Sequence, residues 1–178
     1  MAATATLMLT VGAAADRPVP SRPEIHFAEG VPDDLRALAT ATWGRFLGVF
    51  PARSGCLADV TVKGAWELEN RARYEPDLRR VTIRIPGTAP NLRATLVHEF
   101  AHHVEFTCQE QRRFRPRFLA AQGLPLSAPW FRGAGWERIP SEQFAEATVR
   151  AVVGRASLPL VVVRPEAVEA IGRWGRGG

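Results

Sequence analysis

Three of the four histidines of the chain lie close together in the segment TLVHEFAHHVE, residues 95–105. Among them, His98 and His102 are four residues apart and frame Glu99 in an HExxH pattern. In a helix, residues four apart lie on one face, so both imidazoles can reach the same point. Neutral imidazole is a common zinc ligand. The pattern therefore predicts a zinc site that uses both histidines.

Glu99 is the residue that would give such a zinc site a catalytic use. It is rotated by about 100° from His98 on a helix, so it can lie beside the metal without binding it. There it could accept a proton from a water that the metal activates. The flanking Leu96, Val97 and Phe100 predict a buried helix, in which polar groups are costly unless they are paired. The alternative is a chance match, with hydrogen-bonded core histidines; His103 falls on another face, where we expect a surface histidine.

A zinc enzyme needs a third protein ligand and one open position. No histidine follows His103 and no aspartate follows Asp77. The remaining candidates are Glu105, Glu110, Glu137, Glu142, Glu146, Glu166, Glu169 and Cys108. Cys108 stands where metzincins carry their third ligand, but those enzymes need a glycine at the position of Glu105 to turn the chain.

Glu142 and Glu146 are the better choice because they are four residues apart in the segment SEQFAEATVRA, residues 141–151. Phe144 and Val149 indicate that much of this predicted helix is buried. One carboxylate could bind the metal while the other accepts a hydrogen bond from a ligand histidine, as zinc sites usually require. A solvent-exposed stripe of glutamates is the alternative.

The elements that must position these residues can be read from periodicity and breakers. Alternating apolar and polar residues predict strands at 56–64 and 79–87, joined by a connection or a further strand that turns at Pro76 and Asp77. One predicted helix starts at Asp33, and a second is capped by Asn91 and runs to about Glu110. Further helices are predicted beyond Pro116, after a cap at Ser141, and from Pro165. Residues 158–163 are a short strand or extended segment. We expect residues 1–23 to form a loosely ordered arm and residues 24–178 to form one domain.

HEFAH followed about forty residues later by SEQFAE resembles the gluzincins, the thermolysin-like clan of zinc metallopeptidases. The likeness spans roughly residues 59–154, and the chain length is closest to the single-domain minigluzincins. The resemblance implies that His98, His102 and Glu142 bind zinc, that Glu99 is the catalytic base, and that Glu146 orients His98. It also implies a zincin-like α+β fold, in which an edge strand of a mixed sheet pairs with an extended peptide. The segment RRVTIRIPG, residues 79–87, is the expected strand near that cleft.

The resulting expectation is a zinc-dependent peptidase that acts on a protein or peptide. Thermolysin-like enzymes stabilise the developing oxyanion with a downstream histidine, which this chain lacks. The candidate substitutes are Arg132, Arg138 and Arg150. The loop that contains Trp130, Phe131 and Trp136 could line a substrate pocket or pack in the core. The missing donor leaves a catalytically silent zinc domain as an alternative.

A net charge of +5 permits an anionic partner. One candidate surface is an arginine-rich stretch interleaved with aromatics, Arg112, Arg113, Arg115 and Arg117 with Phe114 and Phe118, although a solvated basic helix face is favoured over a nucleic-acid site. No segment predicts a membrane span. Two cysteines, Cys56 and Cys108, make no disulfide framework and favour a reducing compartment. We therefore expect a cytoplasmic monomer, with secretion a minority alternative from the apolar start of the chain.

Overall fold

The computed structural model describes residues 22–155, 158 and 160–178. Its sheet has the strand order β1-β2-β4-β3, with β1 at Ile25–Phe27, β2 at Val60–Ala65, β3 at Ala72–Glu75 and β4 at Arg80–Arg84. The three strands β1, β2 and β4 are parallel, whereas β3 is antiparallel to β4. The fold is therefore α+β with a small mixed sheet, as the sequence predicted.

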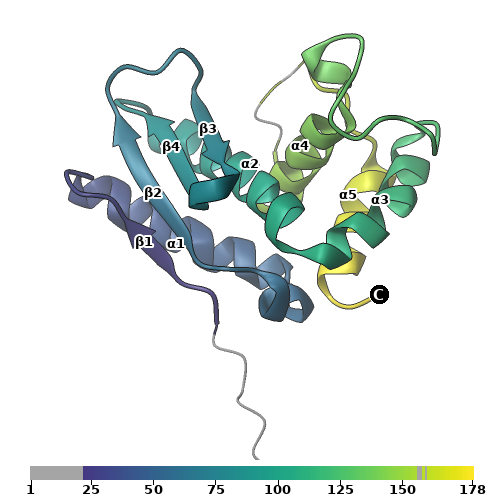
Figure 1. Ribbon diagram of the computed structural model, residues 1–178, viewed down its shortest axis with the longest axis horizontal. Helices are drawn as coiled ribbons and strands as arrows, with labels where there is room; N and C mark the ends of the chain where they lie inside the picture. Colours follow the sequence, from purple (N-terminus) through teal and green to yellow (C-terminus); the bar gives the residue numbers. More distant parts are fainter. Residues whose placement is uncertain (1–21, 156–157, 159) are drawn as a thin grey trace, which may run out of the picture.

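The helices form a group around α2, which lies in the middle of the molecule (Figure 1). The sheet and α1 lie on one side of α2, and α3, α4 and α5 lie on the other. The five α-helices are α1 (Asp33–Val49), α2 (Ala89–Thr107), α3 (Gln109–Gln122), α4 (Pro140–Val153) and α5 (Pro165–Gly175), with short 3-10 helices η1 (Pro51–Cys56), η2 (Pro76–Leu78) and η3 (Trp136–Arg138).

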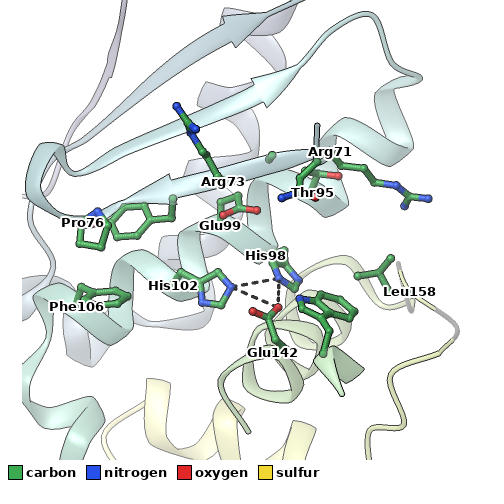
Figure 2. A pocket seen from close by; sticks show the side chains of 14 residues that line it. Arg71, Arg73, Pro76, Thr95, His98, Glu99, His102, Phe106, Glu142 and Leu158 are labelled. Atoms are coloured by element: carbon green, nitrogen blue, oxygen red, sulfur yellow. Dashed lines mark hydrogen bonds and ion pairs between the residues drawn. The ribbon is translucent and has the colours of Figure 1, made fainter. Parts of the chain in front are cut away.

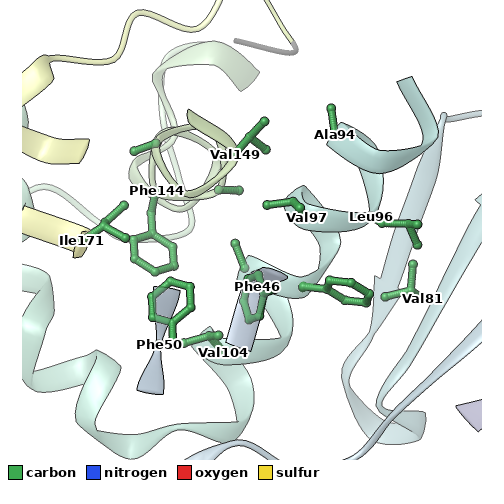
Figure 3. Close-up of a cluster of buried hydrophobic side chains, with 14 of the residues drawn as sticks. Phe46, Phe50, Val81, Ala94, Leu96, Val97, Val104, Phe144, Val149 and Ile171 are labelled. Carbon is green, nitrogen blue, oxygen red and sulfur yellow. The ribbon is translucent and has the colours of Figure 1, made fainter. Parts of the chain in front are cut away.

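Aromatic side chains fix α2 in place because they fill the space beside it. Phe100 of α2 is fully buried, and its ring centroid lies 4.9 Å from that of Trp43 and 5.6 Å from that of Phe46, both on α1. Val97 and Val104 of α2 belong to the same buried cluster as Phe144 of α4 (Figure 3). Aromatic groups of this size dominate core energetics, so the helix that carries the HExxH pattern is held on both sides.

Cys56 and Cys108 form a disulfide bond, with their Cα atoms 4.8 Å apart. The bond ties the end of η1 to the junction between α2 and α3. The two cysteines therefore do not support the expectation of a reducing compartment, because they pair with each other. Sequence spacing did not reveal the pairing because the cysteines are separated by 52 positions, and the chain between them folds back before the two side chains meet.

Several element boundaries differ from those predicted. α2 begins at Ala89 after Thr88 rather than after Asn91, because Pro90 is accepted in a first helical turn. α2 ends at Thr107, and α3 then runs straight through Pro116. Pro116 is exposed, as is Arg112, so solvent can bond to the carbonyl that the proline leaves unpaired.

Two further predictions concern the starts and ends of segments. α4 begins at Pro140 rather than after a Ser141 cap. The described residues of the segment 158–163 contain no strand. The expected arm falls almost wholly outside the described residues. No helix in the described part of the chain is long and apolar enough to cross a membrane.

Candidate metal centre

The structure brings together His98 and His102 from the middle of α2 and Glu142 from the first turn of α4. His98 Nε2 lies 3.0 Å from Glu142 Oε2 and 3.3 Å from His102 Nε2. The third side of this triangle, from His102 Nε2 to Glu142 Oε2, is 3.7 Å. These three residues, called the triad below, face one another across the gap between the two helices (Figure 2).

The distances within the triad can be compared with those that a metal requires. Zinc binds imidazole nitrogen and carboxylate oxygen at about 2.0–2.2 Å, so two ligand atoms of a tetrahedral site lie about 3.4 Å apart. The three measured separations of 3.0, 3.3 and 3.7 Å cluster around that value. The triad therefore has the size and the donor atoms of a three-ligand zinc site.

The outer nitrogens of the two histidines are each held by a buried carboxylate. His98 Nδ1 lies 3.2 Å from Glu146 Oε1, and His102 Nδ1 lies 2.7 Å from Glu105 Oε2. A carboxylate only accepts, so each Nδ1 carries the hydrogen and donates it. Both Nε2 atoms then direct lone pairs at each other and at Glu142. This geometry suits a cation between the three atoms, either a metal ion or, without one, a proton on an Nε2 that donates to Glu142.

The electrostatics of the triad also favour positive charge. Burial opposes protonation of His98, but hydrogen bonds to Glu142 and Glu146 raise its pKa. Burial likewise opposes protonation of His102, yet the charge of Glu105 raises its pKa well above the ordinary value. Although burial opposes ionisation of Glu142, hydrogen bonds from the two histidines lower its pKa to about 2. Glu142 is therefore an ionised carboxylate.

Glu99 lies beside the triad without joining it. Its side chain is almost wholly buried, and burial raises its pKa against the opposing charges of His98 and His102. The backbone of Tyr74 on β3 lies close enough to lower the pKa of Glu99 slightly. Figure 2 shows Glu99 between β3 and the triad, facing the same space as the two histidines. A carboxylate so placed can take up or release a proton at a molecule bound there.

Glu105 has a role that the sequence did not reveal. It accepts hydrogen bonds from Trp130 Nε1 and from Ser141 Oγ, each at 2.8 Å, in addition to that from His102. It appeared in the sequence only as one of several candidate ligands. Its spacing of three residues from His102 was the available signal, because residues three apart on a helix are neighbours.

His103 is fully buried, so the expectation of a surface histidine is wrong. Its Nε2 donates to the carbonyl of Ala58 at 2.8 Å, which leaves Nδ1 to accept from the hydroxyl of Tyr74 at 2.9 Å. Burial lowers the pKa of His103 to about 4, so the ring stays neutral. Because α2 is covered on both sides, its second face is a core face too.

A cleft of about 490 Å³ opens in front of the triad. Residues 70–74, which include most of β3, line it, as do Phe106 and Trp136. The Trp136 ring is nearly parallel to that of His98, with centroids 6.2 Å apart. The strand beside the cleft is thus β3 and not the segment 79–87, since β4 lies inside the sheet with β2 and β3 as neighbours.

The aromatic loop before α4 divides between core and cleft. Trp130 is buried against Phe118 and Phe144, whereas Trp136 lines the cleft. Phe131 is about half exposed and stacks on Phe106. The sequence left both roles open for the loop as a whole, and the structure assigns them to different residues.

The arginines proposed from the sequence as oxyanion donors do not line the cleft. Arg150 donates to the carbonyl of Val163, and Arg138 pairs with Glu137. In the arginine-rich stretch on α3, Phe114 and Phe118 are buried. The suggestion that these two rings stack on nucleic-acid bases is therefore wrong.

Comparison of the chain with protein-family models, with curated proteins and with solved structures found no match.

Proposed function

We propose that this protein is a zinc-dependent peptidase of the gluzincin type. The observation that carries the proposal is the convergence of His98, His102 and Glu142 at metal-ligand spacing, with Glu99 held beside them in an open cleft. The donor set of two imidazoles and one carboxylate is a known catalytic zinc set, and it leaves a coordination position for substrate or water. A purely structural zinc site would have no use for Glu99.

The edge of β3 supports a peptide as the substrate. Arg84 N–H donates to the carbonyl of Arg71, so the backbone groups of residues 71, 73 and 75 face β4. In an antiparallel pair the alternate residues face the other way, so the backbone groups of Ala72 and Tyr74 face away from β4. The Tyr74 backbone lies near Glu99. An extended peptide could add to this edge as a further strand and cross the triad.

The residues of the chain have distinct tasks in the proposed reaction. When bound, zinc would polarise the scissile carbonyl and lower the pKa of a water molecule. Glu99 takes the proton of the attacking water and returns it to the leaving amine. Glu146 and Glu105 hold the two imidazoles so that both Nε2 atoms face the metal.

A zinc-binding domain without peptidase activity is the second candidate. It is favoured by the hydroxyl of Tyr74, which lies at the cleft but donates to His103, and by the distance of Arg138 and Arg150 from the cleft lining. It is disfavoured by the placement of Glu99. A nucleic-acid function is not supported by base stacking on Phe114 and Phe118, because both rings are buried.

The test is to incubate the zinc-loaded chain with a diverse peptide mixture and to identify new termini by mass spectrometry. Metal content is measured in parallel on wild type, His98→Ala and Glu142→Gln. We expect about one zinc per chain in wild type, large losses in both variants, and cleavage only with zinc. Stoichiometric zinc without any cleavage would favour the silent domain, and no zinc in wild type would exclude both.

A further inference from the structure

A second, smaller cavity of about 260 Å³ continues the cleft beyond the triad. Arg71 and Thr95 line both spaces, so the two lie next to each other at these residues. The smaller cavity, called the hollow below, is further lined by Arg84 and Asn91. Figure 2 shows Arg71 extending past Thr95 on this side, whereas Arg73 is directed away from the triad.

Two arginines face each other across the strands beside the hollow. Arg71 and Arg84 are directly opposed, since Arg84 N–H donates to the Arg71 carbonyl at 2.8 Å. Like charges in this position destabilise a sheet. Among the described residues neither has an ion pair with a carboxylate, whereas Arg73 and Arg80 both pair with Glu75. An exposed, uncompensated arginine pair beside a polar hollow is suited to a carboxylate, which guanidinium binds through two parallel hydrogen bonds.

The distance of the hollow from the triad follows from two elements independently. The Tyr74 backbone lies near Glu99, and Arg71, next to the start of β3, precedes Tyr74 by three residues, which is about 10 Å in extended chain. On α2, Asn91 precedes His98 by seven residues, which is also about 10 Å in a helix. An extended peptide covers that distance in about three residues.

We propose that Arg71 and Arg84 bind a carboxylate of the substrate peptide, two or three residues from the bond that lies at the triad. The inference rests on the proposed peptidase function and adds a substrate class to it, namely peptides with a negative charge at that position. An aspartate or glutamate side chain and the C-terminal carboxylate of the chain offer the same chemistry. The first source would suit an endopeptidase, and the second would suit an enzyme that removes a short C-terminal piece.

Binding can be measured separately from cleavage with the zinc-loaded Glu99→Gln variant. Fluorescein-labelled peptides with one glutamate moved stepwise along a neutral sequence, each with a free or an amidated C-terminus, are titrated by fluorescence anisotropy. We expect the best acidic peptide to bind about fivefold tighter than the neutral one. We expect the preference to vanish when Arg71→Gln and Arg84→Gln are added. The matched control is Arg45→Gln, an exposed arginine on α1, which should leave the preference unchanged.

The outcomes separate the two proposals. Equal binding of acidic and neutral peptides, or a preference that survives loss of both arginines, would overturn the carboxylate site even if wild type cleaves peptides. A preference that depends on Arg71 and Arg84, in a chain whose wild type cleaves nothing, would support the site and reject the peptidase. Dependence on the free C-terminus alone would assign the carboxylate to the chain end, and dependence on the glutamate would assign it to a side chain.

Discussion

At the scale of single residues, the proposed function depends on Glu99, the residue that would turn metal binding into catalysis. It is buried next to two imidazoles, yet it lies outside the triad and close to the Tyr74 backbone. Glutamine has the same shape, but it cannot take up a proton. We expect Glu99→Gln to keep zinc and to lower kcat by about 10²- to 10⁴-fold, the usual contribution of a general base.

Steady-state kinetics together with metal analysis of the same preparation check this prediction. The control is Glu69→Gln, because Glu69 is exposed on the connection between β2 and β3 and does not line the cleft. Unchanged kcat in Glu99→Gln would assign the proton transfer to another group.

Glu105 is predicted to tune the metal without touching it. Replacement by glutamine leaves one acceptor oxygen for Trp130, Ser141 and His102, which all donate to the present carboxylate. The His102 ring is then less firmly oriented and its nitrogen is less basic. We expect Glu105→Gln to weaken zinc binding by about 10- to 100-fold.

Competition with a chromophoric chelator measures that affinity. Ser141→Ala is the matched comparison, since it removes one of the hydrogen bonds to Glu105 but leaves the carboxylate on His102. Equal zinc affinity in wild type and Glu105→Gln would mean that His102 is oriented by packing alone.

Some residues of the candidate site could be predicted from the sequence, and others could not, for a physical reason. His98, Glu99 and His102 follow from helical spacing alone. The pair Glu142 and Glu146 follows from its spacing on an apolar helix, and the resemblance to gluzincins selects Glu142 as the ligand. The burial of His103 and the shared use of Glu105 depend on which helices pack against α2. Spacing within one helix contains no information about those neighbours.

At the scale of elements, the edge strand β3 is the part that sequence reasoning could not place. Two clear alternating segments became β2 and β4, but the short ARYE strand was visible only as a connection or a further strand. Its position at the edge depends on the parallel pairing of β2 with β4, which brings two segments together and leaves β3 outside. Strand order is a property of the crossover, and alternation within each strand does not specify it.

The contact between Tyr74 and His103 is predicted to hold β3 on α2. The Tyr74 hydroxyl donates to the buried His103 at 2.9 Å, and the other ring nitrogen already donates to Ala58. Tyr74→Phe keeps the ring but leaves a buried acceptor without its donor, which costs about 1–3 kcal/mol. Chemical denaturation at neutral pH should show this loss. An unchanged midpoint would mean that water replaces the hydroxyl.

Glu75 at the end of β3 should make stability depend on pH in acid. The hydrogen bond from Arg80, aided by that from Thr82, lowers its pKa from 4.5 to about 2 against the effect of burial. The unfolded chain therefore binds this proton first, so the stabilisation is complete above about pH 4.5 and is lost as the pH falls to about 2.

Comparison with Glu75→Gln isolates this contribution. Urea unfolding of both metal-free proteins between pH 7 and pH 2.5 should show wild type more stable at pH 7 and the difference shrinking in acid. A difference that stays constant down to pH 2.5 would contradict the ion pair with Arg80.

At the scale of the whole molecule, the disulfide joins the two halves that flank α2. Cys56 ends η1, which precedes β2 in the chain, and Cys108 lies where α2 meets α3. The bond closes a loop with a sequence separation of 52 residues. In the chain-entropy description, closing such a loop lowers the conformational entropy of the unfolded state, which stabilises the folded state by about 4 kcal/mol. The folded triad does not include either cysteine, so reduction should act on stability and leave the metal-ligand geometry in place.

Denaturation with and without a thiol reductant measures this contribution. We expect reduction to lower the free energy of unfolding of wild type by about 2–4 kcal/mol, with zinc stoichiometry unchanged below the transition. The double variant Cys56→Ala, Cys108→Ala should match reduced wild type and should not respond to the reductant. If oxidised and reduced wild type unfold at the same denaturant concentration, the two halves are held by the aromatic core around Phe100 alone, and the chain would be equally stable in an oxidising and in a reducing compartment.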